Sequence, residues 1–307
     1  RGRGLYDGGP GEHSLGGYPE ESYRTWGGFD WMTATVGGMW DSLLAEGRKW
    51  WSTTTTDGHQ GCGDWVKNPV DDLDQTGYSD RPYNEAGDPF DSTGVSPPPV
   101  NAGRPVVEYS SFTPGAYNKT WVGATEASHR AVMEGMRAGR MWVCFGDLIG
   151  SLQMTLQVAG NRGNRFAVGM GETLEVRTPT EVELKIVIET ADQVNYAGLL
   201  PQLARVDLVL GEITGPTEDR DALRAPGTRV VRSWDTVGQD GTIELTHRFT
   251  LERDVYLRIR GTDGKRSQPG FHGPEVDPVG PALDVVGEVN PWEDLWFYSN
   301  PIFARLG

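Results

Sequence analysis

Apolar and polar residues alternate in repeated stretches between Ser151 and Arg260, and this period of two constrains the fold more than any other feature of the sequence. Successive side chains of a β-strand point to opposite faces, so such alternation is typical of strands with one buried face. Turn sequences such as Gln239-Asp240-Gly241 and Thr262-Asp263-Gly264 interrupt the pattern. We therefore predict an antiparallel β-sandwich over residues 151–307. The alternating apolar residues are Leu152, Met154, Leu156 and Val158; Val182, Leu184, Ile186 and Ile188; Val206, Leu208 and Leu210; Ile243, Leu245, His247 and Phe249; and Val255, Leu257 and Ile259.

Helical spacing is found before this region. Trp40, Leu43 and Leu44 lie on one face of a predicted short helix, and Gly47 is placed to end it because glycine enters the left-handed conformation without steric cost. The aromatic and β-branched residues Trp50 to Thr56 then predict a strand.

A similar helix–strand unit follows later in the chain. Residues Thr125 to Ala138 predict a helix that Thr125 or Ser128 could cap and Gly139 could close, and Met141 to Phe145 predict the next strand. The two helix–strand junctions resemble each other, as expected for consecutive units of one α/β sheet or barrel over residues 1–150. The aromatic tail, residues 290–303, is predicted to pack back on this first part.

The first predicted strand leads directly into Asp57-Gly58-His59. A carboxylate and an imidazole at the carboxyl end of a strand could both bind one metal ion, because active sites of parallel α/β folds lie at these ends. Asp-Gly is also a common turn sequence, so an ordinary turn is the competing interpretation. The preceding helix and strand favour the ligand pair.

Residues 66–118 form a long segment rich in Asp, Pro, Gly, Asn and Ser. An insertion of this length in a compact domain is most often functional, such as a lid or pocket wall. A disordered linker is the alternative, but the segment carries more aromatic residues than disordered chains usually do. We predict that it is packed.

The composition excludes some functions. The net charge of −15 argues against sequence-independent binding to nucleic acid or acidic lipid, which requires a basic surface. No apolar run is long enough to span a bilayer. The chain begins Arg1-Gly2-Arg3-Gly4 without an initiator methionine, so we expect it to be part of a longer precursor. The absence of a targeting signal therefore leaves its localisation unknown.

Several motifs in the same order resemble PHP-domain metallohydrolases, in particular the branch that includes carbamate and ester hydrolases (the CehA/McbA type). The resemblance spans nearly the whole chain. The motifs are Gly27-Gly28-Phe29-Asp30, Val36-Gly37-Gly38-Met39-Trp40-Asp41, Thr56-Asp57-Gly58-His59, Pro114-Gly115-Ala116-Tyr117-Asn118-Lys119-Thr120, Arg137-Ala138-Gly139-Arg140, Arg260-Gly261-Thr262-Asp263-Gly264 and Trp296-Phe297-Tyr298-Ser299-Asn300-Pro301-Ile302.

The resemblance implies that residues 1–150 are the C-terminal part of a distorted α/β barrel holding two or three divalent metal ions (Zn, Mn or Fe). Asp57 and His59 correspond to the family's last metal-binding pair. The loop Tyr6-Asp7-Gly8-Gly9-Pro10-Gly11-Glu12-His13 resembles a Glu-Gly-Ala-Pro-Gly-His loop, which makes His13 a predicted ligand. Asp7 stands where Glu is usual. The substrate-binding residues predicted within the matching motifs are Asp41, Tyr117, Asn118 and Lys119.

The sequence lacks the His-x-His pair with which such metal sites begin, since its histidines are His13, His59, His129, His247 and His272. We interpret His129 and His247 as surface or packing residues. The missing ligands are predicted to come from the N-terminal fragment of the same precursor or from another chain, and the present chain is predicted not to fold alone.

The expected function is hydrolysis of phosphate or related carboxyl and carbamate esters, with the general acid unassigned. The alternative is a catalytically inactive binding or structural subunit that kept the fold. A third interpretation, carbohydrate binding, is prompted by the 11 tryptophans and requires exposed coplanar Trp side chains.

The two cysteines, Cys62 and Cys144, leave three interpretations open. Cys62 could be a soft metal ligand near His59, both could be free thiols, or they could form a disulfide. Neighbouring strands lie about 4.8 Å apart, within the Cα separation that a disulfide allows. A disulfide would favour an extracytoplasmic location.

Overall fold

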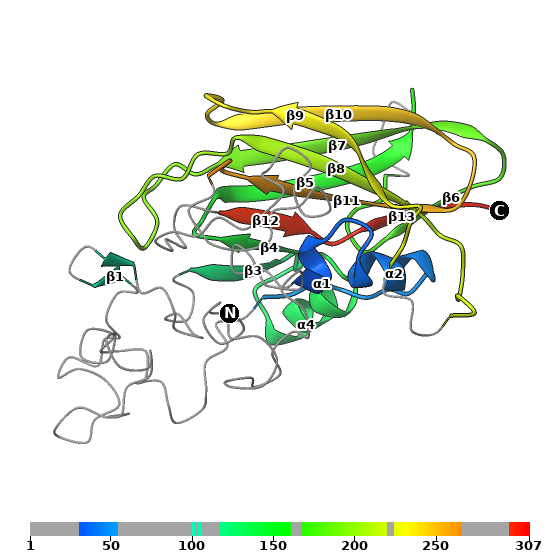
Figure 1. Cartoon of the computed structure of the whole chain (residues 1–307), viewed down its shortest axis with the longest axis horizontal. Coiled ribbons are helices and arrows are strands. Elements are labelled where there is room, and N and C mark those ends of the chain that lie inside the picture. The colour runs from blue at the N-terminus through cyan, green and yellow to red at the C-terminus, as the bar shows by residue number, and fades with distance from the viewer. Residues whose placement is uncertain are drawn as a thin grey trace, which may run out of the picture.

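The computed structural model describes residues 31–54, 100–101, 104–105, 117–160, 167–219, 224–265 and 295–307. In these residues the protein is mostly β-structure, arranged as a three-stranded antiparallel sheet and a larger mixed sheet, with short helices beside the mixed sheet (Figure 1).

The three-stranded sheet has the order β10-β7-β5, in which β5 is Ile149–Val158, β7 is Thr180–Thr190 and β10 is Thr242–Leu251. Both pairings are antiparallel, and the alternating apolar residues share a face: Leu245, for example, lies opposite Ile186, which lies opposite Met154. These three strands confirm the prediction from the period of two.

The mixed sheet is built around β11 (Val255–Thr262). Along one edge, β11 pairs with β8. Along the other edge, its first part pairs with β13 and its last part pairs with β12, and all three pairings are antiparallel. The pairing of β13 with β6 is parallel. The remaining members are β3 (Asn118–Val122), β4 (Met141–Phe145), β6 (Thr173–Val176), β8 (Arg205–Glu212), β9 (Arg229–Asp235), β12 (Trp296–Ser299) and β13 (Ile302–Leu306).

The hydrophobic core lies between the two sheets. Leu184 and Ile186 of β7 and Leu257 and Ile259 of β11 are completely buried in one cluster. The described part of the aromatic tail, residues 295–307, is largely buried, and β12 pairs with β4. Backbone hydrogen bonds therefore join strands on both sides of residue 150, while the predicted division into two domains stays a prediction.

Three helices lie in the described residues: α1 (Trp31–Ala34), α2 (Met39–Ala45) and α4 (His129–Arg137). Helix α2 confirms the first predicted helix, and Gly47 closes it with a φ of +82°. Helix α4 confirms the second predicted helix and Ser128 as its cap, since the Ser128 hydroxyl accepts a hydrogen bond from the Ala131 N–H. Residues 125–127, which the prediction included, precede the helix. None of the helices in these parts of the chain combines the length and apolar character that crossing a bilayer requires.

The predicted strand over Trp50–Thr56 is wrong for residues 50–54, which form no β-ladder. Side chains of other segments form hydrogen bonds with the backbone of these residues instead.

The predicted parallel arrangement of consecutive helix–strand units is also wrong for the described residues. Strand β4 confirms the predicted strand at Met141–Phe145, but it lies between β3 and β12, and both are antiparallel to it. No closed barrel is present in the described residues.

The predicted insertion at 66–118 lies mostly outside the described residues. Two short strands within it, β1 (Val100–Asn101) and β2 (Arg104–Pro105), pair with each other in an antiparallel manner.

Candidate functional site

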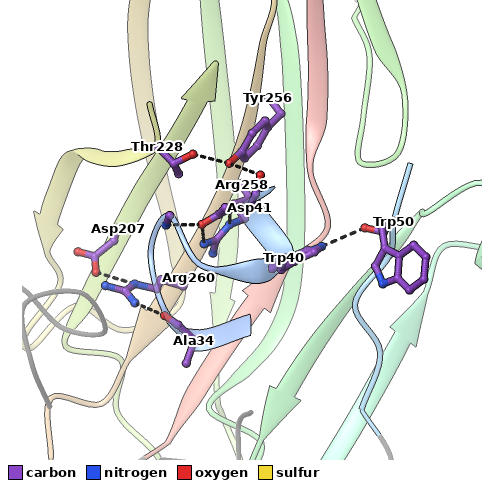
Figure 2. A network of polar contacts seen from close by, with 10 residues as sticks. Ala34, Trp40, Asp41, Trp50, Asp207, Thr228, Tyr256, Arg258 and Arg260 are labelled. Atoms are coloured by element: carbon purple, nitrogen blue, oxygen red, sulfur yellow. Dashed lines mark hydrogen bonds and ion pairs between the residues drawn. The ribbon is translucent and has the colours of Figure 1, made fainter. Parts of the chain in front are cut away.

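Strand β11 has an apolar face and a polar face, and both are buried. Leu257 and Ile259 face the core between the sheets, whereas Tyr256, Arg258 and Arg260 lie on the opposite face under α1 and α2 (Figure 2). Charged residues inside a protein require partners, because burial removes their hydration. The segment from Ala34 to Asp41 supplies some of these partners.

Asp41 of α2 forms a fully buried ion pair with Arg258. Arg258 Nε donates to Asp41 Oδ1 at 2.8 Å and Nη2 donates to Oδ2 at 2.6 Å, and neither side chain is exposed. The Arg258 guanidinium also lies 4.8 Å from the ring centre of Trp40. Burial by itself lowers the pKa of Arg258, but the charge and hydrogen bonds of Asp41 outweigh burial and raise the pKa above its ordinary value.

Gly37 completes the environment of Asp41. Its N–H donates to Asp41 Oδ2 at 2.7 Å, and its φ is +71°. A Cβ at this position would lie 2.9 Å from the carbonyl oxygen of Ala225, so glycine is required by both the conformation and the space.

Arg260 makes a second buried attachment. Its Nε donates to Asp207 Oδ2 at 3.2 Å and its Nη1 donates to the Ala34 carbonyl oxygen at 3.2 Å. Asp207 also accepts hydrogen bonds from Arg205 and Ser233. The two arginines of β11 therefore hold α1 and α2 on the mixed sheet.

Tyr256 is a neutral hydrogen-bonding group in the same layer. Its hydroxyl lies 2.7 Å from Thr228 Oγ1 and donates to the Asp41 carbonyl oxygen at 3.3 Å. Burial, and then the nearby charge of Asp41, raise the pKa of Tyr256 well above its ordinary value. The phenol therefore stays protonated at neutral pH.

A second group of polar side chains holds residues 51–54, which we name the anchored segment. Asn300 Oδ1 accepts from the Ser52 N–H at 2.7 Å, and Asn300 Nδ2 donates to the Ser52 carbonyl oxygen at 3.2 Å. The Thr120 hydroxyl accepts from the Thr54 N–H and donates to the Thr54 carbonyl oxygen, both at 3.0 Å. These side chains replace the backbone partners of a neighbouring strand.

Further contacts fix the two ends of the anchored segment. Asn118 Nδ2 donates to Thr54 Oγ1 at 3.0 Å. Trp51 Nε1 donates to the Arg137 carbonyl oxygen at 3.0 Å, and the Trp51 ring packs edge-on against Phe303. The segment is therefore held by residues of β3, α4 and the tail.

The predicted substrate-binding residues do not form one cluster in the structure. Asp41 is paired with Arg258 on β11, and Tyr117 is buried against Phe145. Asn118 and Lys119 are successive residues of β3, so their side chains point to opposite faces. Lys119 binds Asp147 at 2.6 Å, with about a third of each side chain exposed.

The predicted metal ligands His13, Asp57 and His59 lie outside the described residues. Within the residues that are described, no three His, Cys, Asp or Glu side chains are grouped so that they could hold a metal ion. Cys144 is a free, buried thiol whose pKa burial raises to about 12, and Cys62 lies outside the described residues. The structure therefore gives no support to a disulfide at Cys144.

Other sequence predictions concern aromatic and histidine side chains. His247 lies on the apolar face of β10 as predicted, and it is half-buried. Trp121 is exposed but stacks in parallel on Trp142, which is buried, so this pair does not form the exposed coplanar surface that carbohydrate binding requires.

Sequence reasoning missed Arg258, Thr120 and Asn300. Arg258 and Arg260 occupy the polar positions of an alternating strand, so their pattern predicts exposure, whereas both are completely buried. Asn300 precedes a proline at the end of an aromatic run and, like Thr120, lies in a motif of the family resemblance, but neither feature indicates that it holds residues 51–54.

Comparison of the sequence with protein-family models gives no match, and comparison with curated proteins finds no similar sequence.

Proposed function

We propose that this chain is the C-terminal part of a PHP-type, metal-dependent hydrolase of phosphate or related carboxyl and carbamate esters. The remaining metal ligands would come from the N-terminal fragment of the same precursor or from another chain that carries a His-x-His pair. The observation that carries the proposal is the way in which the anchored segment, residues 51–54, is held.

Side chains from separate motifs meet on this segment. Asn118 and Thr120 belong to the motif at 114–120, and Asn300 belongs to the motif at 296–302. The contacts span 64 to 248 residues of sequence. Asp57 and His59 follow the segment after only a few residues. Motifs that the family resemblance singles out therefore converge where the chain leads into the predicted ligand pair.

The chemistry of the predicted ligands fits the proposal. Imidazole and carboxylate groups suit zinc, manganese and iron, so His13, Asp57 and His59 could share in holding two or three divalent ions. When bound, such ions lower the pKa of a coordinated water to about 7 and polarise an ester oxygen. Asn300 and Thr120 would contribute by fixing the backbone at Ser52 and Thr54, from which the chain continues to Asp57 and His59.

One observation favours the alternative, an inactive binding or structural subunit. Of the predicted substrate-binding residues, Asp41, Tyr117 and Asn118 are 0%, 2% and 6% exposed. Asp41 is neutralised by Arg258, and Asn118 contacts Thr54. These roles support the fold. Lys119 alone among the four keeps substantial solvent exposure.

An experiment on the native assembly, produced by expressing the full precursor, distinguishes the two functions. Metal content and hydrolysis of p-nitrophenyl phosphate and p-nitrophenyl acetate are measured for the wild type and for an Asp57→Asn/His59→Ala variant. We expect this variant to lose bound metal and to hydrolyse at least about 100-fold more slowly, because two ligands are removed.

The matched control is Asp240→Asn/His129→Ala, which changes an exposed acid and an exposed histidine and should leave metal content and activity unchanged. The proposal is wrong if the Asp57→Asn/His59→Ala variant keeps the metal content and the hydrolysis rate of the wild type. Isolation of the chain alone, folded and free of metal, would support the inactive subunit.

A further inference from the structure

The β-sandwich is open along one edge. Strand β9 is an edge strand of the mixed sheet and β10 is an edge strand of the three-stranded sheet. Both run along the same margin of the molecule (Figure 1). A cavity of about 270 Å³ lies there, lined by residues of β8, β9 and β10 and by the start of β11. We name it the edge cavity.

The floor of the edge cavity is apolar. Leu251 and Val255 are buried members of the core, and Leu210, Val231 and Phe249 are only partly buried and pack against the same core. Apolar surface that is continuous with the core is therefore accessible at this edge. Partly exposed apolar surface of this kind is suited to the apolar part of a ligand.

Two arginines of β9 lie on the inward side of this edge: Arg229 lines the edge cavity, and Arg232 lies beside its wall, near enough for its charge to act on the lining residue His247. Arg229 lies opposite Leu210 and Arg232 lies opposite Leu208, whose side chains face the core. Residues directly opposite each other in an antiparallel pair share a face, so both arginines point toward the side of β10. Arg232 also lies 5.8 Å from the ring centre of Trp234.

These arginines lack acidic partners in the part of the chain that the structure describes. By contrast, Arg253 at the rim binds Glu212 at 2.9 Å, and Arg248 on the outer face of β10 binds Glu183 at 2.7 Å. Glu252 is a further acidic residue at the rim and is exposed. Arg229 and Arg232 are therefore the two guanidinium groups at this edge that remain available to an anionic ligand in the described residues.

His247 adds a polar group to the wall of the edge cavity. Its ring stacks on Phe249, with ring centres 6.0 Å apart. Burial, and then the charge of Arg232, lower the pKa of His247, so the imidazole is neutral at pH 7 and can both donate and accept a hydrogen bond.

We propose that the edge cavity binds a small carboxylate with an apolar chain. The apolar chain would lie on Leu210, Val231 and Phe249, and the carboxylate would face Arg229 and Arg232, since guanidinium groups pair well with carboxylates. The volume is below the usual range for drug-sized ligands, so the ligand is a small one. This proposal does not depend on the proposed metal site.

The probe is octanoate, titrated at pH 7 into the full chain together with any partner fragment that co-purifies, and followed by calorimetry and by ligand-observed NMR. We expect saturable one-to-one binding. The Arg229→Gln/Arg232→Gln variant should bind at least about tenfold more weakly, because both charged partners of the carboxylate are lost. Both arginines are exposed, so the substitutions should leave the fold intact.

Octanol and octyltrimethylammonium test the charge requirement, and Arg248→Gln is the control variant because it changes an exposed arginine on the other face of β10. We expect Arg248→Gln to bind octanoate as the wild type does. The proposal is overturned if octanoate does not bind, if octanol or octyltrimethylammonium binds equally well, or if Arg248→Gln weakens binding as much as the double variant does.

Discussion

Two ion pairs with the same shortest N–O distance lie in very different surroundings. Asp41 and Arg258 approach to 2.6 Å with neither side chain exposed, and Lys119 and Asp147 approach to 2.6 Å with 34% and 31% of their side chains exposed. The first pair attaches α2 to β11, and the second joins β3 to the turn after β4. Sequence reasoning assigned Asp41 and Lys119 the same role, substrate binding.

Burial, more than distance, decides what such an ion pair contributes to stability. Removing one partner of a buried pair leaves an uncompensated charge and typically costs about 3–5 kcal/mol. A partly exposed pair is screened by water and salt and contributes about 0–1 kcal/mol. The anchored segment is an intermediate case, because its hydrogen bonds are neutral and only partly buried.

The largest effect is expected from Arg258→Leu. This change leaves the Asp41 carboxylate buried without its cation, so the free energy of unfolding should fall by about 3–5 kcal/mol. Urea unfolding measures the loss, or the soluble fraction after expression if the variant does not fold. The Asp41→Leu/Arg258→Leu variant removes both charges and should recover much of the loss. If Arg258→Leu alone lowers the free energy of unfolding by less than about 1 kcal/mol, burial does not make this ion pair stronger than an exposed one.

An intermediate effect is expected from Asn300→Ala. The Ser52 N–H and carbonyl oxygen both lose their partner, and we expect a loss of about 1–3 kcal/mol in the free energy of unfolding. Hydrogen exchange at the Ser52 amide should also accelerate. The comparison variant is Asn300→Asp, which keeps an acceptor for the Ser52 N–H but buries a carboxylate beside the Ser52 carbonyl oxygen, so it should cost at least as much as Asn300→Ala. Equal exchange of Ser52 in the wild type and Asn300→Ala would show that the amide does not hold the segment.

The smallest effect is expected from Lys119→Met, which should change the free energy of unfolding by no more than about 1 kcal/mol. The difference from the wild type should shrink further at about 1 M salt, where screening acts over about 3 Å. Asp147→Asn is the matched change, because asparagine tolerates the positive φ of 55° at this position. A loss of unfolding free energy as large as that of Arg258→Leu, and unaffected by salt, would show that exposure does not weaken the Lys119–Asp147 pair.

Much of the secondary structure could be predicted from local pattern. The alternating stretches became β5, β7, β8, β10 and β11, and the helices closed by Gly47 and Gly139 were found because their apolar spacing and caps are adjacent in sequence. The strand predicted over Trp50–Thr56 is wrong for residues 50–54 because a β-rich composition does not provide a neighbouring strand. Side chains of Thr120 and Asn300 take that place instead.

The candidate site was less predictable than the fold. The sequence pointed to the neighbourhood of Asp57 and His59, and the structure adds that Asn118, Thr120 and Asn300 converge on the segment leading to them. The sequence could not indicate that Arg258 neutralises the charge of Asp41, since the two residues are 217 positions apart.

Most strands and helices follow from local sequence, because alternation, helical spacing and glycine at chain reversals act between near neighbours. Strand pairing depends on tertiary contacts, and so does the choice of a polar residue between water and another part of the chain. Arg258 and Arg260 occupy positions that their own strand would leave exposed, but α1 and α2 cover them, and Asp41 and Asp207 supply their charge partners. Burial and charge pairing depend on contacts between distant segments, and these exist only in the folded chain.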